Sequence, residues 1–412
     1  MANVRKDQCL PLEIPSGHHV AHCNLYRVVA ITANMMQPMT PTAHAQPAPE
    51  RMLFVDAFRG FDMFWLIGGY YIVKALVAWI NWPPLTEAAE REMDHPVWSG
   101  FHWWDVIMPT FIFISGVTIP LAITRRLERG ESKTILYWRL LKRLVLLQCL
   151  NLAYYGALQN LDWHQMRFGG VLAHIGWAYF FAGIIAIHTK PRQQFIWALG
   201  ILLGYWSAMT LIPMPGAGTG LMTPDGSLAG YIDRSLMPGI LYGELYEREG
   251  LFATVPTIAT VLMGALAGHW LLSDRKGTTK VFGLLGAGVA CRLLGQLWSL
   301  SMPINTKMWT PSLVLAAGGW SLIFRAAFYL VIDVWQLRRW AFFFVVIGMN
   351  SIFIYFLPVI VDLDQVASRI YHGFVLLFPK PAQPLLTAVC AMIGVQWLLL
   401  WLLHRKKIYL RA

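Results

Sequence analysis

Long apolar runs recur along the chain from Leu53 onward, separated by shorter polar stretches. A run of roughly 18–25 residues is long enough to cross about 30 Å of hydrocarbon as a helix, at 1.5 Å per residue. The pattern therefore predicts an all-α, polytopic integral membrane protein with about ten transmembrane helices. The predicted spans are 53–79, 101–124, 140–158, 170–188, 194–213, 252–272, 280–300, 310–333, 340–360 and 383–403.

Basic residues gather in alternate loops of this pattern. Loops rich in Lys and Arg stay in the cytoplasm, and an even number of spans returns the chain to its starting side, so both termini are predicted to be cytoplasmic. Eighteen basic residues lie on that side: Arg125, Arg126, Arg129, Lys133, Arg139, Lys142, Arg143, Lys190, Arg192, Arg275, Lys276, Lys280, Arg338, Arg339, Arg405, Lys406, Lys407 and Arg411. Seven lie on the other: Arg91, Arg167, Arg234, Arg248, Lys307, Arg369 and Lys380.

The amino-acid composition also indicates an integral membrane protein. Apolar residues form 57% of the chain and charged residues 13%, against about 25% charged residues in ordinary soluble domains. Because a soluble core cannot hide that much apolar surface, the expected surroundings are the lipid bilayer. The net charge of +11 comes from short clusters between spans, which argues against a nucleic-acid partner. Cys149, Cys291 and Cys390 lie in apolar runs, so no disulfide framework is expected.

Residues 1–50 differ from the rest, since they hold several Pro and His residues and no long apolar run. We expect a disordered N-terminal extension there and a transmembrane domain over residues 51–412. Two loops on the predicted outer side stand out, 81–100 and 212–250. Loops as long as the second are usually functional or disordered, and its aromatic and acidic residues favour an ordered loop.

Charged side chains inside predicted spans are costly in lipid and become functional candidates if each has a partner. Asp56, Arg59 and Asp62 follow at intervals of three residues and are predicted to pair along one helix face. A structural ladder and a ligand-facing role both fit this spacing.

Asp105 lies within the second predicted span, one turn before Pro109. An unpaired carboxylate there would become neutral. Arg292 and Arg325, also inside predicted helices, are its predicted partners, and binding of an anion is their alternative role.

His95 is the strongest single candidate for acid–base chemistry, because histidine titrates near neutral pH and can remove and return a proton. It lies in an outer loop that re-enters the membrane through Trp98-Ser99-Gly100, and Asp94 beside it is expected to raise its basicity. A lone loop histidine is more often solvated or packed than catalytic, so the residues alone leave both interpretations open. His102 and His174 are weaker candidates of the same kind.

Several familiar sites are missing from the sequence. Serine-hydrolase elbows, phosphate-binding P-loops, dinucleotide fingerprints and HExxH zinc motifs do not occur, and no metal is predicted. Gly264 and Gly268 form a GxxxG step, which indicates close helix packing rather than a binding site.

A series of short motifs resembles the heparan-alpha-glucosaminide N-acetyltransferase family of transmembrane acetyltransferases. The motifs keep one order over nearly all of residues 51–412, and the run from Arg59 to Trp65 looks closer to the bacterial, NagX-like branch. The motifs are Val55-Asp56-Ala57-Phe58-Arg59-Gly60, His95-Pro96-Val97-Trp98-Ser99-Gly100, Asp105-Val106-Ile107-Met108-Pro109, Pro213-Met214-Pro215-Gly216, Ala229-Gly230-Tyr231-Ile232-Asp233-Arg234, Gly348-Met349-Asn350-Ser351 and Arg405-Lys406-Lys407-Ile408.

The resemblance implies a membrane enzyme that takes acetyl from cytosolic acetyl-CoA, as co-substrate, and delivers it to an amino sugar on the outer side. The family's active-site histidine falls on His95, in a matching His-x-x-Trp-x-Gly context. Two positions depart from the family pattern. A polar Asn of the first matching helix aligns near Tyr70, and the Arg of a Gly-Val-Leu-x-Arg motif is replaced by His174. These departures concern the acceptor more than the donor.

Acetyl transfer from a thioester needs a base, donors for the oxyanion and an anchored acetyl donor. We predict His95 as the base, with Asn350, Tyr70 or Ser99 as the oxyanion donor. Coenzyme A carries several phosphates, so basic residues are its predicted site, although topogenic charge alone explains most of them. The predicted donor-binding residues are Arg59, Arg125, Arg126, Arg139 and Arg143, and the predicted acceptor-binding residues are Asp94, Trp98, Asp105, His174 and Asp233.

Two other functions remain open at this point. A secondary transporter or permease for a sugar or glycopeptide shares the helix count and the buried charges, but it would move its substrate unmodified. An O-acyltransferase of cell-envelope polysaccharide would form an alkali-labile ester instead of an amide. Direct transfer and a transient acetyl-histidine are also both open. A homodimer and a bacterial inner-membrane location complete the predictions.

Overall fold

The computed structural model describes residues 53–156 and 162–409, so the predicted extension over residues 1–50 lies outside the described residues. Within these ranges every named element is a helix. Eight helices are long and apolar enough to cross a bilayer, and the number becomes nine if one bent pair is counted as a span. The all-α, polytopic membrane architecture is confirmed for the described residues, whereas the cytoplasmic location of both chain ends stays a prediction.

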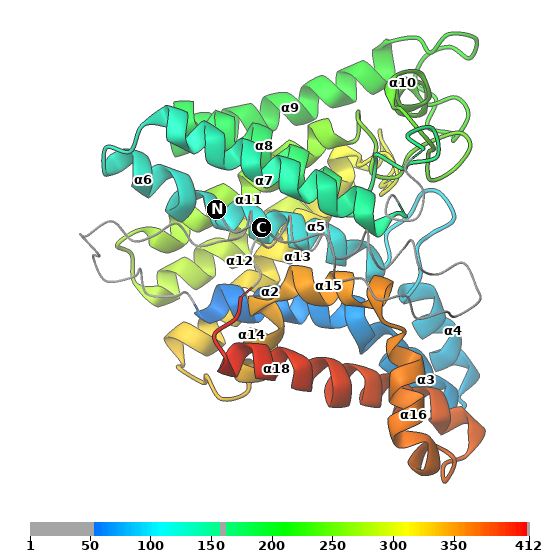
Figure 1. Cartoon of the computed structure of the whole chain (residues 1–412). Coiled ribbons are helices and arrows are strands. Elements are labelled where there is room, and N and C mark those ends of the chain that lie inside the picture. Colours follow the sequence, from blue (N-terminus) through cyan, green and yellow to red (C-terminus); the bar gives the residue numbers. More distant parts are fainter. Residues whose placement is uncertain (1–52, 157–161, 410–412) are drawn as a thin grey trace, which may run out of the picture.

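The elements follow one another along the chain as one series of helices, several of them continued by short π-helical turns (Figure 1). They are α2 (Leu53–Phe64), η1 (Trp65–Gly69), α3 (Tyr70–Ile80), α4 (Pro83–Glu92), α5 (Trp104–Val117), η2 (Pro120–Thr124), α6 (Arg125–Glu128), α7 (Lys133–Tyr154), α8 (Val171–His188), α9 (Pro191–Leu211), α10 (Leu228–Leu236), α11 (Thr254–Leu272), α12 (Gly277–Trp298), α13 (Pro311–Tyr329), η3 (Leu330–Val334), α14 (Ala341–Met349), α15 (Ser351–Ile360), α16 (Leu363–Val375), η4 (Lys380–Ala382), α17 (Gln383–Val389), η5 (Cys390–Trp397) and α18 (Leu398–Arg405).

The predicted span 140–158 falls on α7, which is not among the eight or nine helices. The cause is its charge, because Arg139, Lys142 and Arg143 all lie in this helix. Helix α7 nevertheless lies alongside α8 (Figure 1) and buries Leu140 and Leu147 in the same core.

The predicted span 340–360 is not one straight helix. It divides into α14 and α15, which are bent by 68° relative to each other. The break is at Asn350, whose backbone has φ −127° and ψ 37° and whose side-chain amide donates to the carbonyl oxygen of Ile408 at 3.3 Å. Asparagine side chains compete with helical hydrogen bonds, and here the break aims α15 along a new direction.

Glycines set the close contacts that hold the central helices. A Cβ atom on Gly264 or Gly268 would collide with the carbonyl oxygens of Phe113 or Val117, so α11 packs backbone to backbone against α5. The prediction that this GxxxG step serves helix packing is confirmed. Helices α2 and α14 meet in the same way at Gly60 and Gly348. These contacts fix α5 and α2, which both line the site described below.

The long helices run in similar directions, which gives the bundle two ends (Figure 1). One end, called the His95 end below, carries the segment 81–103, which includes α4, and the segment 212–253, which includes α10. The opposite end, called the basic end, carries α6 and the turns that lead into α7 and α12. The predicted outer loop 212–250 is built around α10.

Candidate active site

His95 and Asp105 form a hydrogen-bonded pair at the His95 end. His95 lies in the loop before α5, and Asp105 lies in the first turn of that helix. The His95 Nδ1 atom is 2.5 Å from Asp105 Oδ1, and the Asp105 side chain is fully buried while the His95 side chain is 26% exposed. Because the carboxylate accepts the Nδ1 proton, Nε2 is left as the ring nitrogen that accepts a proton from a ligand.

Local hydrogen bonds hold this pair in place. Asp105 Oδ2 accepts from the His102 backbone N–H at 2.9 Å, and Asp94 Oδ1 accepts from the His95 backbone N–H at 2.8 Å. Lys307 Nζ donates to the carbonyl oxygens of Pro96 and Val97, each at 2.7 Å. The loop is therefore tied at both of its ends, which fixes the orientation of the imidazole.

Two expectations about these residues are wrong. Asp94 was expected to act on the His95 ring, but its carboxylate binds the backbone of His95, and Asp105 contacts the ring instead. Arg292 and Arg325 were the expected partners of Asp105. Arg292 donates to Gln296 at 3.0 Å, and the guanidinium carbon of Arg325 lies 4.1 Å from the centre of the Phe54 ring.

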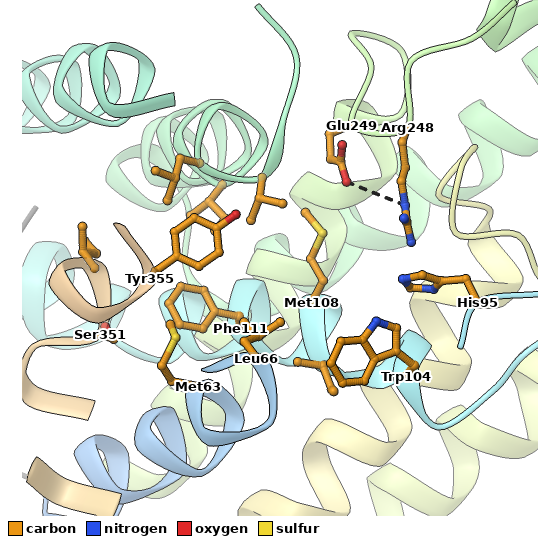
Figure 2. A pocket seen from close by; sticks show the side chains of 15 residues that line it. Met63, Leu66, His95, Trp104, Met108, Phe111, Arg248, Glu249, Ser351 and Tyr355 are labelled. Carbon is orange, nitrogen blue, oxygen red and sulfur yellow. Dashed lines mark ion pairs between the residues drawn. The ribbon is translucent and has the colours of Figure 1, made fainter. Parts of the chain in front are cut away.

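A narrow cavity of about 150 Å³ begins at His95 and runs into the bundle. Figure 2 shows it, with His95, Trp104 and Arg248 at one end and Met63 and Ser351 at the other. Along α5 it is lined at positions 104, 107, 108 and 111, which is one helix face about 10 Å long. Its walls are mostly apolar side chains, and its charged groups, Arg248 and Glu249, lie at the His95 end.

Charged residues of the segment before α11 close the His95 end of the cavity. Arg248 and Glu249 both line it, and Arg248 Nε is 3.8 Å from Glu249 Oε1. Behind them Arg167 donates to Glu247 Oε2 at 3.1 Å and to Glu249 Oε2 at 2.9 Å. Burial raises the pKa of Glu249, although both arginines oppose that effect.

The surroundings of His95 favour its neutral form. Burial is the largest cause and lowers the pKa of the imidazole, the Asp105 hydrogen bond raises it, and the nearby cations Arg248 and Lys307 lower it further. The net result is a pKa below the ordinary value of 6.5. At neutral pH the ring is therefore unprotonated and ready to accept a proton.

The residues predicted to bind the acceptor are only partly brought together. Trp98 donates its indole N–H to the Met222 carbonyl and packs edge-on against Tyr246, so it joins the two loops of this end. His174 is buried between Thr254 and Thr257, with Nε2 2.7 Å from Thr257 Oγ1. Neither lines the cavity.

Asp233 also lies away from the cavity. It is buried on α10, and its Oδ1 accepts from the backbone N–H groups of Leu251 at 2.9 Å and Phe252 at 3.4 Å. It therefore holds the segment that follows Arg248 and Glu249. Burial raises the pKa of Asp233 to about 7.

This raised pKa makes a stability prediction for Asp233→Asn. The folded protein holds the Asp233 proton more tightly than the unfolded chain, so its stabilising effect is complete below about pH 4 and is lost as the pH rises to about 7. Asparagine has no proton to lose and still offers an oxygen to Leu251. We expect the melting temperature of Asp233→Asn, relative to wild type, to rise between about pH 5 and pH 8. A constant difference over this range would contradict the assignment.

The predicted oxyanion donors lie outside the cavity lining. The Tyr70 ring packs on Trp104, with centroids 4.9 Å apart. Ser99 Oγ accepts from Asn305 Nδ2 at 3.4 Å. Asn350 lies at the break before α15, next to Ser351, which does line the cavity at its far end.

The basic residues predicted to bind the donor lie at the basic end or near it. Glu131 pairs with Arg139 at 2.6 Å and with Arg126 at 3.3 Å. The guanidinium carbon of Arg143 lies 4.0 Å from the centre of the Tyr179 ring, and Arg125 begins α6. Arg59 pairs with Asp56 at 3.4 Å. Their role in donor binding stays a prediction.

The expected three-residue ladder along α2 is incomplete. Asp56 and Arg59 pair, but Asp62 is buried, and its Oδ2 atom has no hydrogen-bond partner among the residues that the structure describes. An α-helix has 3.6 residues per turn, so a side chain six residues further along points to a different face. Asp62 therefore does not lie in line with Asp56.

Sequence reasoning missed Arg248, Glu249 and Trp104 as cavity residues. The available signal was the charged run Glu247-Arg248-Glu249 shortly before an apolar span, which is easily interpreted as an ordinary solvated loop. Within the described residues no group of three or more His, Cys, Asp or Glu side chains is arranged to hold a metal ion. The absence of a metal cofactor stays a prediction.

Comparison with known proteins found no matching family model. Two curated proteins are similar in sequence, and both are named heparan-alpha-glucosaminide N-acetyltransferase. The protein of Homo sapiens is 28% identical over 370 residues, which are 74% of this chain and 52% of that protein. The protein of Mus musculus is 27% identical over 383 residues, 77% and 54% of the two chains. The chain thus spans about half the length of the curated relatives it matches.

Proposed function

We propose that this chain, a relative of the heparan-alpha-glucosaminide N-acetyltransferases, is a membrane acyltransferase that moves acetyl from acetyl-CoA to the amino group of an amino sugar. The observation that carries the proposal is the His95–Asp105 pair at the polar end of a narrow cavity that runs into the bundle. The donor is proposed to arrive from the cytoplasm and the acceptor from the outer side.

The shape of the cavity fits part of the donor. A volume of about 150 Å³ with apolar walls accepts a slender chain and excludes a nucleotide. The end of the pantetheine arm of coenzyme A is such a chain, and its thioester would lie at the polar end beside His95. The phosphates remain outside the cavity, where basic side chains attract them.

The chemistry requires an amine that has lost its extra proton. An amino-sugar ammonium is unreactive until a base removes a proton, and neutral His95 accepts it at Nε2. His95 releases this first proton to solvent and is neutral again when the amine nitrogen attacks the thioester carbonyl carbon; it then takes the second proton from that nitrogen. Asp105 stabilises the imidazolium that forms, and the departing thiolate takes the proton. The products are an amide and the coenzyme A thiol.

The lowered pKa of His95 makes a prediction about pH. Activity needs the neutral ring, so kcat/KM is expected to be level through neutral pH and to fall on the acid side. The midpoint of this fall should be below 6.5, the ordinary histidine value, because burial and two cations lower the pKa of His95. Steady-state rates between about pH 5 and pH 8 measure the midpoint, and a value above 6.5 would contradict the proposed electrostatics.

Thiol release tests the function directly. Purified protein in detergent with acetyl-CoA and glucosamine is expected to release free coenzyme A and to form an alkali-stable amide. An alkali-labile product would indicate O-acyl transfer, and transport without thiol release would indicate a carrier. The bacterial branch, the inner-membrane location and the homodimer stay predictions.

A further inference from the structure

Arg248 is a cation at the cavity mouth that has only a weak partner. Figure 2 shows its guanidinium pointing toward the His95 ring from the opposite wall. Within the described part of the chain its one ion pair is to Glu249, at 3.8 Å and through Nε. That geometry leaves the two outer nitrogens of the guanidinium facing the cavity, where they are free to bind a ligand.

The other charges at this end are already engaged. Asp105 accepts from the His95 ring and from the His102 backbone, and Lys307 donates to two backbone carbonyls. Arg167 donates to both Glu247 and Glu249. Arg248 is therefore the guanidinium at this mouth that is left to meet an anion.

We propose that Arg248 is a further catalytic residue, whose guanidinium holds the oxyanion of the tetrahedral intermediate. This inference rests on the proposed function. When the amine attacks, the N–C bond forms and the carbonyl π pair moves to oxygen, next to Arg248. When the intermediate collapses, that pair re-forms the carbonyl, the C–S bond breaks and the thiolate leaves with the proton that His95 carried. No other reactant is needed.

The position suits this role better than the positions of the donors first predicted. An oxyanion donor must reach the atom on which charge develops, in a site shielded from water. Arg248 and His95 line the same end of one cavity, so a carbonyl carbon that His95 serves lies within reach of Arg248. Tyr70, Ser99 and Asn350 line no part of that cavity.

Arg248 also acts on the base. The groups that face the His95 ring are Asp105, which raises the pKa of the imidazole, and Arg248 and Lys307, which lower it, together with the uncharged Trp104. Removing the Arg248 charge should raise the pKa of His95. The acid limb of the rate profile would then move to higher pH, which a purely structural role would not cause.

The test compares Arg248→Gln, Arg248→Lys and the control Arg91→Gln, using acetyl-CoA and glucosamine. Arg91 lies on the same end of the protein, and its side chain is 66% exposed. We expect kcat of Arg248→Gln to fall about 10²–10³-fold, the loss typical of one oxyanion donor, with little change in KM for acetyl-CoA. Arg248→Lys should retain more activity than Arg248→Gln and keep the acid limb in place, and Arg91→Gln should match wild type.

Each other outcome decides against the inference. Three outcomes would show that Arg248 does not stabilise the transition state, while leaving the proposed function intact. They are an unchanged kcat in Arg248→Gln, an effect confined to KM for glucosamine, and equal losses of kcat in the Gln and Lys variants. Wild-type protein that releases no thiol would overturn both. Melting temperatures in detergent show whether each variant is folded. If Arg248→Gln does not fold, the comparison of kcat between Arg248→Lys and wild type tests the inference.

Discussion

Replacing His95 by alanine is expected to lower the rate of acetyl-CoA-dependent thiol release by about 10²–10⁴-fold, the contribution typical of a general base. The loss should appear in kcat, because the apolar walls that hold the donor arm are untouched. Steady-state rates of coenzyme A release with glucosamine as acceptor measure it.

His372→Ala is a matched control for this change. His372 lies on α16, is exposed, and does not line the cavity, so its removal should leave the rate at the wild-type value. Equal rates for His95→Ala and wild type would remove His95 from the chemistry, even if the protein proves to be an acetyltransferase.

Asp105→Asn should cause the second large loss. The amide keeps the shape of the carboxylate, but its NH₂ group offers a proton to His95 Nδ1 where the carboxylate accepted one. The ring then carries its proton on Nε2, the nitrogen that should accept a proton from the amine. In serine hydrolases the equivalent change lowers kcat by about 10⁴-fold, and we expect a loss of about 10²–10⁴-fold here.

Asp94→Asn separates this effect from general damage to the loop. Its carboxylate accepts from the His95 backbone N–H, and an asparagine oxygen can accept the same bond, so we expect a rate close to that of wild type. If the two Asn variants lost activity equally, the loop as a whole, rather than the orientation of the ring, would be responsible.

The membrane fold was predictable because lipid imposes one simple rule, that long apolar runs become helices. Close helix packing at Gly264 and Gly268 was predictable from their spacing, whereas the partner helix, α5, was not. The break between α14 and α15 was not predictable, since a single polar residue, Asn350, inside an apolar run is its one indication in the sequence. The three charges of α7 that exclude it from the helices able to cross a bilayer, Arg139, Lys142 and Arg143, were visible in the sequence.

The residues of the candidate site were likewise predictable only in part. His95 was predictable from its chemistry and from the motif around it, whereas its partner was not. Asp94 is adjacent in sequence, but an adjacent side chain rarely reaches the ring, and Asp105 does so because the chain turns into α5 between them. Arg248 reaches the cavity from a loop far along the chain, and no local pattern indicates such a contact. Residues brought together by tertiary folding are the part that sequence reasoning could not supply.

A structure of the protein with a stable thioether analogue of acetyl-CoA tests the central claim most directly. The account predicts that the pantetheine arm follows the face of α5 past Met108 and that the acetyl carbonyl lies beside His95 Nε2, with room for an amine at about 3–3.5 Å. An analogue whose arm lay outside this cavity, with its carbonyl remote from His95, would contradict the account.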